Sequence, residues 1–529
     1  MLLALVLCLF PMVKAQDPNN YPPDNTTVVI DSTNLPIVWI DVDGATIMRD
    51  ERIGGRMKII HNGKGRLNYA DTVAHPGQTV DYEGYIALRY RGYSSYKQSD
   101  KKPYSFRTLS QPYDSVYDKK KVKILGMGKD NDWALLAPFF DKSMIRDLLG
   151  FEIASPWMEY TPQGRYCELF LDGTYYGVYI LSEVVSKGKQ RLNLDDPGDS
   201  GDAITGGYLM EVGRGEDMYI VSKYNPVDNN GQPYRDRYIL FEHKEPDYED
   251  LTWPQIEYIK GAITRMEDAF ASSNFMDPEN GYRKYIDVQS FMDYQLVEEV
   301  SHNVDAYRLS GKFFKRRDSI DQRFKMVVWD LNLAFGNARY SDGDTWVHSL
   351  NPIFYSQRGQ MIPFWWYKLN SDPEYTAVLK ARWAQYRRSN LRLDRIMATI
   401  DSLANEVTCC GAVDRNSEAW PRWGVSVWPN YVVTNGYEEE ITYLKQWLTH
   451  RIAWMDTQLG FDPNTNERGD VNGDGNVDVT DLTLLIGYVL SDDATDIDLD
   501  AADCNLDGTR NISDVTRLIA YILDGTWVY

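Results

Sequence analysis

The sequence predicts an α+β protein: a large domain in which strands precede helices, followed by a small all-α domain with two ion-binding loops. Short runs rich in β-branched and aromatic residues occupy most of residues 36–181, whereas helical spacing dominates residues 373–459. Residues 467–529 contain one segment written twice. Apolar residues make up 43% of the 529-residue chain, which excludes wholesale disorder and leaves room for several domains.

The duplicated segment has the spacing of a calcium-binding loop. Residues 470–481 align without a gap on residues 503–514, and an apolar stretch follows each copy. Oxygen-bearing side chains recur at alternate positions, and a glycine at the sixth position permits a sharp turn. We therefore predict two bound Ca²⁺ ions. The expected ligand residues are Asp470, Asn472, Asp474, Asn476, Asp478 and Asp481 in loop 1, and Asp503, Asn505, Asp507, Thr509, Asn511 and Asp514 in loop 2.

The charge of this terminal segment gives a physical reason for calcium dependence. Residues 467–529 hold 14 acidic and 3 basic residues, a net charge of −11 out of −21 for the chain. A domain of this size has a small core, and its clustered carboxylates repel one another without cations. Ion binding and folding are therefore expected to be coupled.

Two such loops, each followed by one helix, resemble the type I dockerin, a module that docks onto cohesin domains in secreted bacterial assemblies. The resemblance covers residues 467–529 and implies a cohesin as partner. By that resemblance, loop positions 10 and 11 choose the partner; here they are Val479, Thr480, Ile512 and Ser513. Arg510 departs from the family at position 8, where an aliphatic residue is usual. The alternative is a calcium-stabilised terminal domain with no dedicated receptor.

The N-terminal segment predicts export. Residues 2–13 are apolar, and a small residue, Ala15, precedes the polar sequence, as signal peptidase prefers. No internal apolar run is long enough to span a bilayer. We expect a secreted protein, free or retained at the cell surface. The predicted boundaries are a signal peptide (1–15), a linker (16–30), a β-rich segment (31–80), the large domain (81–460), a linker (461–466) and the calcium module (467–529).

Composition excludes other classes of protein. No basic stripe offsets the acidic balance, which argues against a nucleic-acid partner. The six histidines are scattered, which argues against a zinc hydrolase, and no Gly-x-Ser-x-Gly motif occurs, which argues against a serine hydrolase. Of the five cysteines, Cys409 and Cys410 are adjacent and could form only a strained ring. The cysteines do not make a disulfide framework.

Local patterns predict the elements of the large domain. Strands are expected at residues 36–41, 57–60, 85–91 and 102–109, and at 166–171 and 175–181, which Asp172 and Gly173 join as a hairpin. Helices are expected at 141–153, with Asp141 as N-cap, and at 251–271 and 288–300. Strands return at 313–315 and 324–329. Helices follow from 373 to 459, with a Trp- and Pro-rich break at 420–429.

Four separated segments suggest phosphoryl transfer when they are taken together. Residues 89–95 form a turn rich in small, donor-bearing groups, and two lysines open the next strand. A glutamate ends the strand at residues 177–183, and an aspartate at 305 precedes another at 330. Phosphoryl transfer needs amide and cationic donors around the phosphates, a carboxylate that holds magnesium, and a carboxylate near the attacking hydroxyl. Two aspartates in this order follow the order of the catalytic and metal-binding aspartates of protein kinases.

Together these segments resemble the spore-coat protein H (CotH) kinase family, a secreted, atypical branch of the protein-kinase fold. The likeness spans about residues 85–340. It implies an atypical kinase-like catalytic domain that uses ATP with Mg²⁺ or Mn²⁺. By resemblance Asp305 is the catalytic carboxylate, Asp330 binds the metal, Lys102 contacts the phosphates and Glu183 orients the lysine or the metal. Arg91, Ser94 and Ser95, with Lys102, form the nucleotide-binding turn, and Asn332 is a second metal ligand.

Some of these residues also have structural interpretations. Lys101 and Lys102 could be solvated strand-edge residues, and Asp330 could pair with Arg146 instead of a metal. Glu183 and Glu211 could simply end their strands. Two further residues or segments have structural interpretations as well: His302 is expected to pack or hydrogen-bond, and the aromatic cluster 364–367 to lie in the core.

The function predicted first is a secreted kinase that acts on Ser or Thr of extracellular proteins, with its dockerin raising its local concentration near co-assembled substrates. It requires Asp305 and Asp330 to converge on one cavity that faces an ammonium group; a guanidinium that pins either acid, or an acid that points away, would overturn it. The alternative is a catalytically silent adhesion or scaffold domain, because the asparagine that the family often has after the catalytic aspartate is missing and only Ser310 or Asn332 could replace it. A third, weaker interpretation is a carbohydrate-binding protein.

Overall fold

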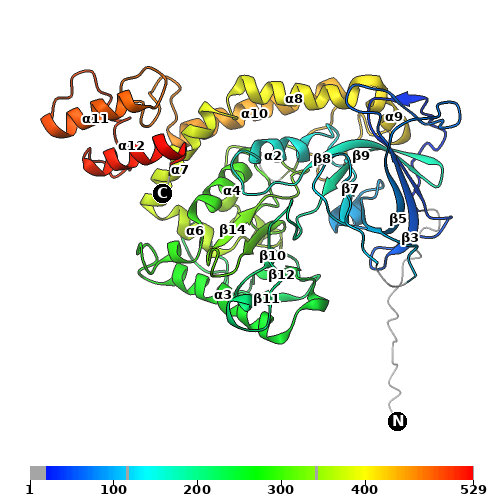
Figure 1. Ribbon diagram of the computed structural model, residues 1–529, viewed down its shortest axis with the longest axis horizontal. Coiled ribbons are helices and arrows are strands. Elements are labelled where there is room, and N and C mark those ends of the chain that lie inside the picture. The colour runs from blue at the N-terminus through cyan, green and yellow to red at the C-terminus, as the bar shows by residue number, and fades with distance from the viewer. Residues whose placement is uncertain (1–19, 115–117, 340–342, 528–529) are drawn as a thin grey trace, which may run out of the picture.

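The computed structural model describes residues 20–114, 118–339 and 343–527 (Figure 1). The predicted signal peptide (1–15) and the first residues of the predicted linker lie outside the described residues. The described chain contains a β-barrel, a second sheet flanked by helices, and a small helical domain at the C-terminus. No helix in the described part of the chain is both long and apolar enough to cross a bilayer.

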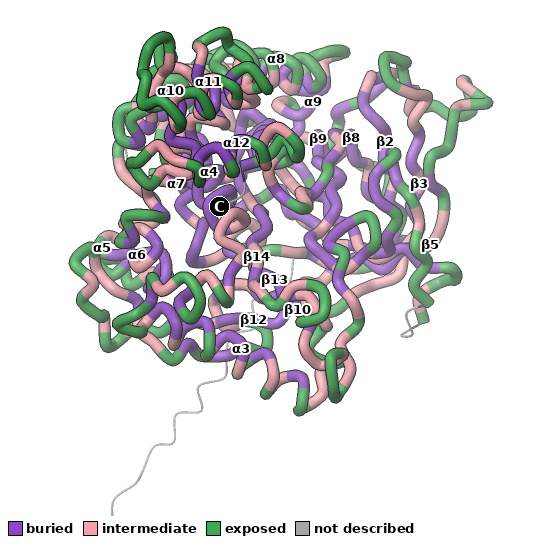
Figure 2. Tube along the Cα trace, turned by 60° about the vertical axis from the view of Figure 1, so that its left-hand side comes forward, coloured by how far each residue is buried: buried purple, intermediate pink, exposed green. Residues whose placement is uncertain are grey.

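Seven strands close into a barrel in the order β2-β3-β5-β6-β7-β9-β8, with β2 and β8 parallel and the other neighbours antiparallel. Apolar side chains from these strands form one core cluster inside the barrel, and much of the chain along the strands is buried (Figure 2). The predicted hairpin is confirmed: Asp172 and Gly173 join β8 and β9 with positive φ angles of 46° and 78°. The strands are β2 (Ile37–Asp41), β3 (Ile53–Ile60), β5 (Val80–Tyr90), β6 (Tyr104–Leu109), β7 (Asp132–Leu136), β8 (Gly164–Leu171) and β9 (Thr174–Glu183).

The barrel corrects two predicted boundaries. Residues 31–80 are not a separate β-rich segment, because β2 and β3 are integral strands of the barrel. A two-stranded pair, β1 (Ser32–Thr33) with β4 (Asn68–Tyr69), also lies in this region. The described part of the predicted 16–30 linker is not a free connection either, since Val28 and Ile30 are buried in the barrel core.

A second, antiparallel sheet lies beside the barrel in the order β11-β12-β10-β13-β14. Helices α3 and α4, predicted at residues 251–271 and 288–300, lie within one or two residues of those bounds. Capping residues set their starts: Thr252 forms a capping box, and the side chain of Asp287 accepts from Ser290 N at 3.0 Å. The elements are β10 (Tyr208–Val212), β11 (Tyr219–Val221), β12 (Leu240–Glu245), α3 (Trp253–Ala271), α4 (Val288–Ser301), β13 (Gly311–Lys315) and β14 (Phe324–Val327).

Helices form the rest of the large domain. The predicted helix at 141–153 begins later, at Arg146, because the carboxylate of Asp141 accepts from Arg146 N and Ser143 N in the preceding turn. The Trp- and Pro-rich break forms no helix or strand, as predicted. Of the aromatic cluster, Phe364, Trp365 and Trp366 are buried, as the core interpretation expected. The helices are α1 (Ser94–Gln98), α2 (Arg146–Ala154), α5 (Asn351–Ser356), α6 (Phe364–Asn370), α7 (Pro373–Arg388), α8 (Leu393–Thr408), α9 (Ala412–Ala419) and α10 (Tyr437–Leu459).

The C-terminal domain consists of α11 (Val479–Ser491), α12 (Ile512–Asp524) and the loop before each helix. Its core is small and includes Leu485, Leu518 and Trp527.

The connection to this domain is held against α7. Arg388 NH2 donates to the carbonyls of Thr465 and Asn466 at 2.9 and 3.2 Å, and the guanidinium groups of Arg387 and Arg388 lie 5.2 and 5.1 Å from the ring of Phe461. The predicted linker at 461–466 is therefore anchored to the large domain.

Candidate functional site

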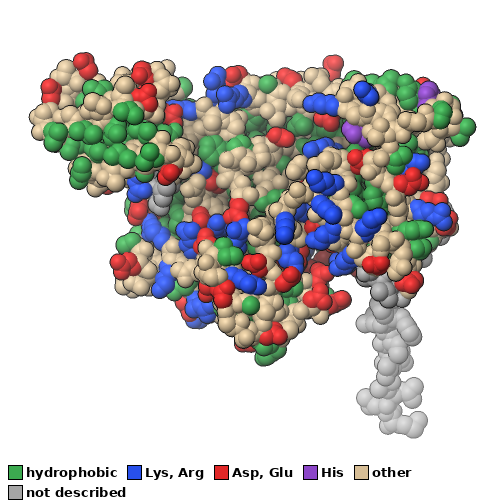
Figure 3. Space-filling model, viewed as in Figure 1, with side chains coloured by type: hydrophobic (Ala, Val, Ile, Leu, Met, Phe, Trp, Pro, Cys, Tyr) green, Lys and Arg blue, Asp and Glu red, His purple; other side chains and the backbone are tan. Residues whose placement is uncertain are grey.

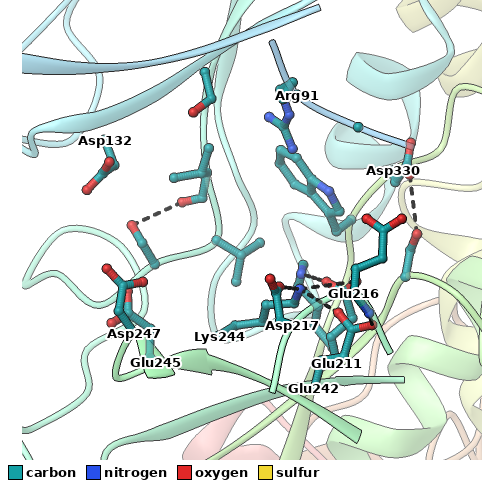
Figure 4. Close-up of a pocket in the computed structure, with 18 of the residues that line it drawn as sticks. Arg91, Asp132, Glu211, Glu216, Asp217, Glu242, Lys244, Glu245, Asp247 and Asp330 are labelled. Carbon is teal, nitrogen blue, oxygen red and sulfur yellow. Dashed lines mark hydrogen bonds and ion pairs between the residues drawn. The ribbon is translucent and has the colours of Figure 1, made fainter. Parts of the chain in front are cut away.

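A cleft of about 890 Å³ lies between the barrel and the second sheet (Figure 4). The turn that follows β5 forms one wall, β10 and β12 form the other, and the loops around β13 and β14 close the inner end. Six of the predicted site residues line this cleft, from three segments far apart in sequence. They are Arg91, Ser94, Ser95, Asp305, Asp330 and Asn332.

Arg91 presents an incompletely bonded cation at this site. Its backbone N–H donates to Pro103 O at 3.0 Å, which fixes the start of the turn, and its guanidinium lies 5.1 Å from the ring of Trp329. Nη1 is buried and has no hydrogen-bond partner among the described residues. Burial lowers the pKa of Arg91, and the charges of Asp330 and Asp147 oppose this. A buried N–H without an acceptor is unfavourable, so this geometry favours an anion as ligand.

The turn after Arg91 is shaped by a glycine. Gly92 has a φ of +78°, and a Cβ there would lie 2.1 Å from Ser95 Oγ. Only glycine therefore permits the chain to fold back so tightly. Ser94 and Ser95 are half-buried and line the cleft beside Arg91.

Asp330 follows the buried Trp329 and has a left-handed backbone with φ of +64°. For a residue with a Cβ this conformation costs about 1–3 kcal/mol, and such strain concentrates at functional sites. Its Oδ2 accepts from Ser310 Oγ at 3.2 Å, and its Oδ1 accepts from the amide of Asn332. Burial raises the pKa of Asp330 and the charge of Asp305 raises it further, while Arg91 opposes both effects.

Asn303 holds the two predicted acids in one place. Its side-chain amide donates to Asp330 O at 3.1 Å, and its Oδ1 accepts from Asp305 N at 3.3 Å. Asp305 itself pairs through Oδ1 with Arg308 NH2 at 2.8 Å. The two aspartates thus converge on one cleft, as the kinase interpretation required. The guanidinium on Asp305 is the feature that was expected to overturn that interpretation.

Lys312 on β13 places an ammonium group in the cleft within reach of the charge of Asp330, and the sequence interpretation did not include it. It lies opposite Glu211 in the β10–β13 register, and the two side chains form an ion pair. Burial, followed by the charge of Arg91, lowers the pKa of Lys312 to about 7, while Asp330 opposes the shift. The signal was present in the sequence as a lysine seven residues after Asp305, within a strand that the pattern predicted only from residue 313.

Basic residues predominate on the barrel wall of the cleft and acidic residues on the sheet wall, although Asp50, Asp130 and Asp132 lie on the former and Arg214, Lys244 and Lys312 on the latter. Figure 3 shows Lys and Arg side chains gathered where the barrel meets the second sheet. Two ion pairs cross the cleft, Arg49 with Glu216 at 2.7 Å and Arg107 with Asp247 at 3.3 Å. On the barrel side the basic residues are Arg49, Arg52, Arg89, Arg91, Arg107, Lys119 and Lys121, and on the sheet side the acidic residues are Glu211, Glu216, Asp217, Glu242, Glu245, Asp247 and Asp250.

In the C-terminal domain, the first and last carboxylates of each loop point inward. Asp470 accepts from Asp474 N and Gly475 N at 3.1 and 3.0 Å, and Asp481 Oδ1 accepts from Val471 N at 2.7 Å. The second loop repeats this pattern: Asp503 accepts from the amides of Asp507 and Gly508, and Asp514 from that of Asn505.

Burial raises the pKa of Asp470 and of Asp514, and neighbouring loop carboxylates raise each further. Crowded carboxylates that share a tightly turned loop with amide oxygens suit a hard cation such as Ca²⁺. The residue at position 8 of loop 2, Arg510, is accommodated by donating to Leu499 O at 2.6 Å and to Gly508 O at 2.9 Å.

The four residues expected to choose a partner are all exposed. Val479 and Ile512 begin the two helices and are 61% and 66% exposed, and Thr480 and Ser513 follow them. Leu490 and Leu523 are also largely exposed. Figure 3 shows hydrophobic side chains gathered on this domain. An apolar surface of this kind on a small domain is typical of a protein–protein contact.

Comparison with protein-family models assigns both parts of the chain. The model of the CotH kinase protein matches residues 88–455. The chain belongs to the CotH kinase family. The model of the dockerin type I domain matches residues 468–523, so the C-terminal domain is a dockerin, a domain that binds Ca²⁺ and implies a cohesin partner. No curated protein matches the chain.

Within the CotH domain, the structure contradicts the predicted roles of Lys102 and Glu183. Neither lines the cleft. Lys102 Nζ donates to Tyr96 O and Ser99 O at 2.6 and 2.5 Å, so the ammonium ties down the turn before β6. Lys102 and Lys101 are both buried, and the strand-edge alternative for the two lysines is wrong as well.

Glu183 is fully buried beneath the barrel wall. Its Oε1 accepts from Gly128 N at 2.8 Å, and its Oε2 accepts from Tyr160 OH at 3.1 Å. The ion pair proposed between Asp330 and Arg146 is also wrong, because Arg146 pairs with Asp141 and Glu440 at 2.6 and 2.8 Å. His302 lies at the C-terminus of α4 and is buried, 3.4 Å from Thr345 Oγ1.

The cleft of the CotH domain offers few candidate ligands for a divalent cation. No three His, Cys, Asp or Glu side chains gather as a ligand set in the part of the chain that the structure describes. Asp330 and Asn332 are the residues that fit. Magnesium is usually bound by one or two carboxylates together with substrate phosphates, which is consistent with this sparse set.

Proposed function

We propose that this chain is a secreted protein kinase that transfers the γ-phosphate of ATP to Ser or Thr side chains of extracellular proteins. The observation that carries the proposal is the guanidinium of Arg91, whose Nη1 is buried without a hydrogen-bond partner among the described residues, beside the carboxylate of Asp330, whose backbone is left-handed. An unbonded cationic donor next to a candidate metal ligand suits a phosphate chain that carries a metal ion. Membership of the CotH kinase family supports the same class of reaction.

In this proposal the phosphates lie between Arg91 and Lys312. Arg91 donates two hydrogen bonds from a planar group, and the backbone of the turn at Ser94 and Ser95 supplies further donors. Lys312 takes the role that the sequence gave to Lys102, and Glu211 takes the role given to Glu183. Glu211 holds the ammonium in position through their ion pair. The bound phosphates would favour the charged form of Lys312, which burial disfavours.

Asp330, with Asn332, would hold Mg²⁺ or Mn²⁺, and the ion supplies charge neutralisation at the phosphates. Ser310 donates to Asp330 at 3.2 Å and orients it. Asp305 receives a hydrogen bond from Arg308 at 2.8 Å, so one of its two carboxylate oxygens is already engaged. We therefore assign Asp305 to orienting the acceptor hydroxyl, because phosphoryl transfer with a loose transition state needs little proton abstraction.

The test uses the full chain, ATP labelled at the γ-phosphate, Mg²⁺ or Mn²⁺, and a mixture of co-secreted proteins. Label should enter protein with the wild type and be lost with Asp330→Asn and Asp305→Asn, which preserve side-chain shape. If wild type and both variants give the same incorporation, the kinase proposal is wrong. The melting temperature of each variant, measured alongside, shows that lost transfer is not lost folding.

A second candidate is a catalytically silent scaffold, and the Arg308–Asp305 ion pair is the observation that favours it. A silent domain with an emptied nucleotide site should show no thermal shift on addition of ATP with Mg²⁺ or Mn²⁺. A shift that Lys312→Met removes would favour the kinase.

We also propose that the dockerin carries the enzyme to a cohesin-bearing assembly outside the cell, with Val479, Thr480, Ile512 and Ser513 in the contact. Binding to an immobilised cohesin in Ca²⁺ should be lost on chelation, and Val479→Asp with Ile512→Asp should abolish it while Ca²⁺ binding remains. Retention of cohesin binding by the double variant would refute this assignment of the contact.

A further inference from the structure

Two adjacent thiols occupy the turn that joins α8 and α9. Cys409 and Cys410 are both exposed and unbridged, and their Sγ atoms lie 3.6 Å apart. The other two cysteines in the described residues, Cys167 and Cys504, are buried. Within the described chain, a thiol-specific reagent can therefore react with two neighbouring sulfur atoms at this exposed pair.

The backbone of this turn is unfavourable for a cysteine. Cys409 has φ and ψ of −55° and 129°, and Cys410 has 65° and 21°, which are the angles of the two central residues of a type II turn. The second central position requires a positive φ and normally carries glycine or asparagine. Arg415 NH1 donates to Cys410 O at 2.6 Å and holds the turn through a backbone atom. The thiol of Cys410 contacts the backbone N–H of Asn34 and the Sγ of Cys409, but the backbone conformation of the turn by itself favours glycine at this position.

We propose that Cys409 and Cys410 form a redox-active vicinal dithiol, a modification site that a small disulfide such as oxidised glutathione converts reversibly to an intramolecular disulfide. One thiolate attacks a sulfur of the small disulfide, forms a mixed disulfide and releases one small thiol. The second cysteine, as thiolate, then attacks the protein sulfur and releases the other. The two cysteines lose two electrons and two protons, and the small disulfide becomes two small thiols.

The geometry predicts a labile bond. Consecutive Cα atoms are about 3.8 Å apart, whereas Cα atoms of ordinary disulfides are about 4.4–6.8 Å apart. The eight-membered ring is therefore strained, and strained disulfides have more oxidising potentials and are readily reduced. The pair should therefore be oxidised and reduced as the ratio of thiols to disulfides in the surroundings changes, and should not form a permanent structural disulfide.

The turn lies away from the cleft, at the start of the helix that seals the barrel. Arg415 pairs with Glu168 on β8, and Asn416 accepts from Lys101 Nζ at 2.7 Å and from Val178 N at 3.0 Å. None of these residues lines the cleft. Closing the ring is therefore expected to leave nucleotide binding unchanged, which separates this proposal from the proposed function.

The experiment treats the reduced full chain with oxidised glutathione, alkylates the remaining thiols and measures the peptide that contains both cysteines by mass spectrometry. The peptide should lose the mass of two hydrogen atoms and carry no alkyl group, and dithiothreitol should reverse the change. In Cys409→Ser and Cys410→Ser the peptide should instead carry one glutathione. If the wild-type peptide takes two alkyl groups or two glutathiones under oxidising conditions that saturate exposed thiols, the proposal is overturned.

A second variant tests whether Cys410 has only a structural role. Glycine suits the positive φ, so Cys410→Gly should have a melting temperature equal to or above that of the reduced wild type, and should no longer form the ring. A lower melting temperature for this variant, together with failure of the wild-type pair to close a ring, would overturn the proposal, because the thiol would then have only a structural role. Phenylarsine oxide, which bridges two neighbouring thiols, should bind the reduced wild type in a dithiol-reversible manner and fail to bind this variant.

Discussion

Arg91 provides the sharpest test of the proposed nucleotide site. Arg91→Met keeps an apolar stem against Trp329 and removes the guanidinium, whose Nη1 is buried without a partner. A hydrogen bond to a charged group contributes about 1.5–3 kcal/mol. Since about 1.4 kcal/mol corresponds to a tenfold change in affinity, we expect the variant to bind ATP with Mg²⁺ about 10- to 150-fold more weakly.

Arg52 is a matched control, because it also lines the cleft but its guanidinium is committed to protein acceptors. It donates to Ala87 O and Ser105 O at 3.1 and 3.0 Å and to Ser105 Oγ at 2.9 Å. Arg52→Met should lower the melting temperature and leave nucleotide affinity nearly unchanged.

Calorimetric titration with a non-transferable ATP analogue measures both variants. Wild-type affinity in Arg91→Met, or an equal loss of affinity in the Arg52 variant, would refute the argument from the unbonded guanidinium.

Three further predictions concern stability and calcium. Arg146→Met leaves two buried carboxylates, Asp141 and Glu440, without their cation, and should lower the free energy of unfolding by about 3–5 kcal/mol in urea titration; a loss below about 1 kcal/mol would contradict this. Burial raises the pKa of Glu267 from 4.5 to about 7. Between pH 4.5 and 7 the native state therefore keeps a proton that the unfolded chain releases. The stabilisation from this proton is fully present below pH 4.5. It is lost as the pH rises towards 7, which lowers the free energy of unfolding by roughly 3 kcal/mol. Glu267→Gln should flatten that part of the pH–stability curve, and an unchanged slope would refute the assignment. Asp514→Ala should abolish Ca²⁺ binding by loop 2 in calorimetry, and two Ca²⁺ ions still bound would show that this carboxylate is not a ligand.

The sequence predicted those parts of the candidate site that are set by local patterns along the chain. Asp305 and Asp330 follow a helix end and a buried strand, and both positions come from local patterns that the structure retains. The turn at Arg91, which we propose contacts the phosphates, is similarly local, because one glycine and one strand end define it.

The lysine could not be predicted in the same way. Lys102 precedes a strand of the barrel, whereas Lys312 lies on β13 of the second sheet, and only the tertiary arrangement decides which ammonium faces the cleft. Barrel closure buries Glu183, and the pairing of β10 with β13 in the second sheet sets Glu211 opposite Lys312. Barrel closure joins β2 to β8 across more than a hundred residues, and strand patterns carry no record of such pairing.

The anchored connection between the two domains changes what docking would accomplish. Estimates of local concentration for tethered enzymes assume a linker that samples many directions. Here Phe461 and the carbonyls of Thr465 and Asn466 contact two arginines of α7. These contacts restrict the orientation of the cleft relative to the exposed dockerin helices. When the dockerin is bound, the cleft would therefore face a limited set of directions. The choice of target would depend on which neighbouring proteins the scaffold places opposite the cleft.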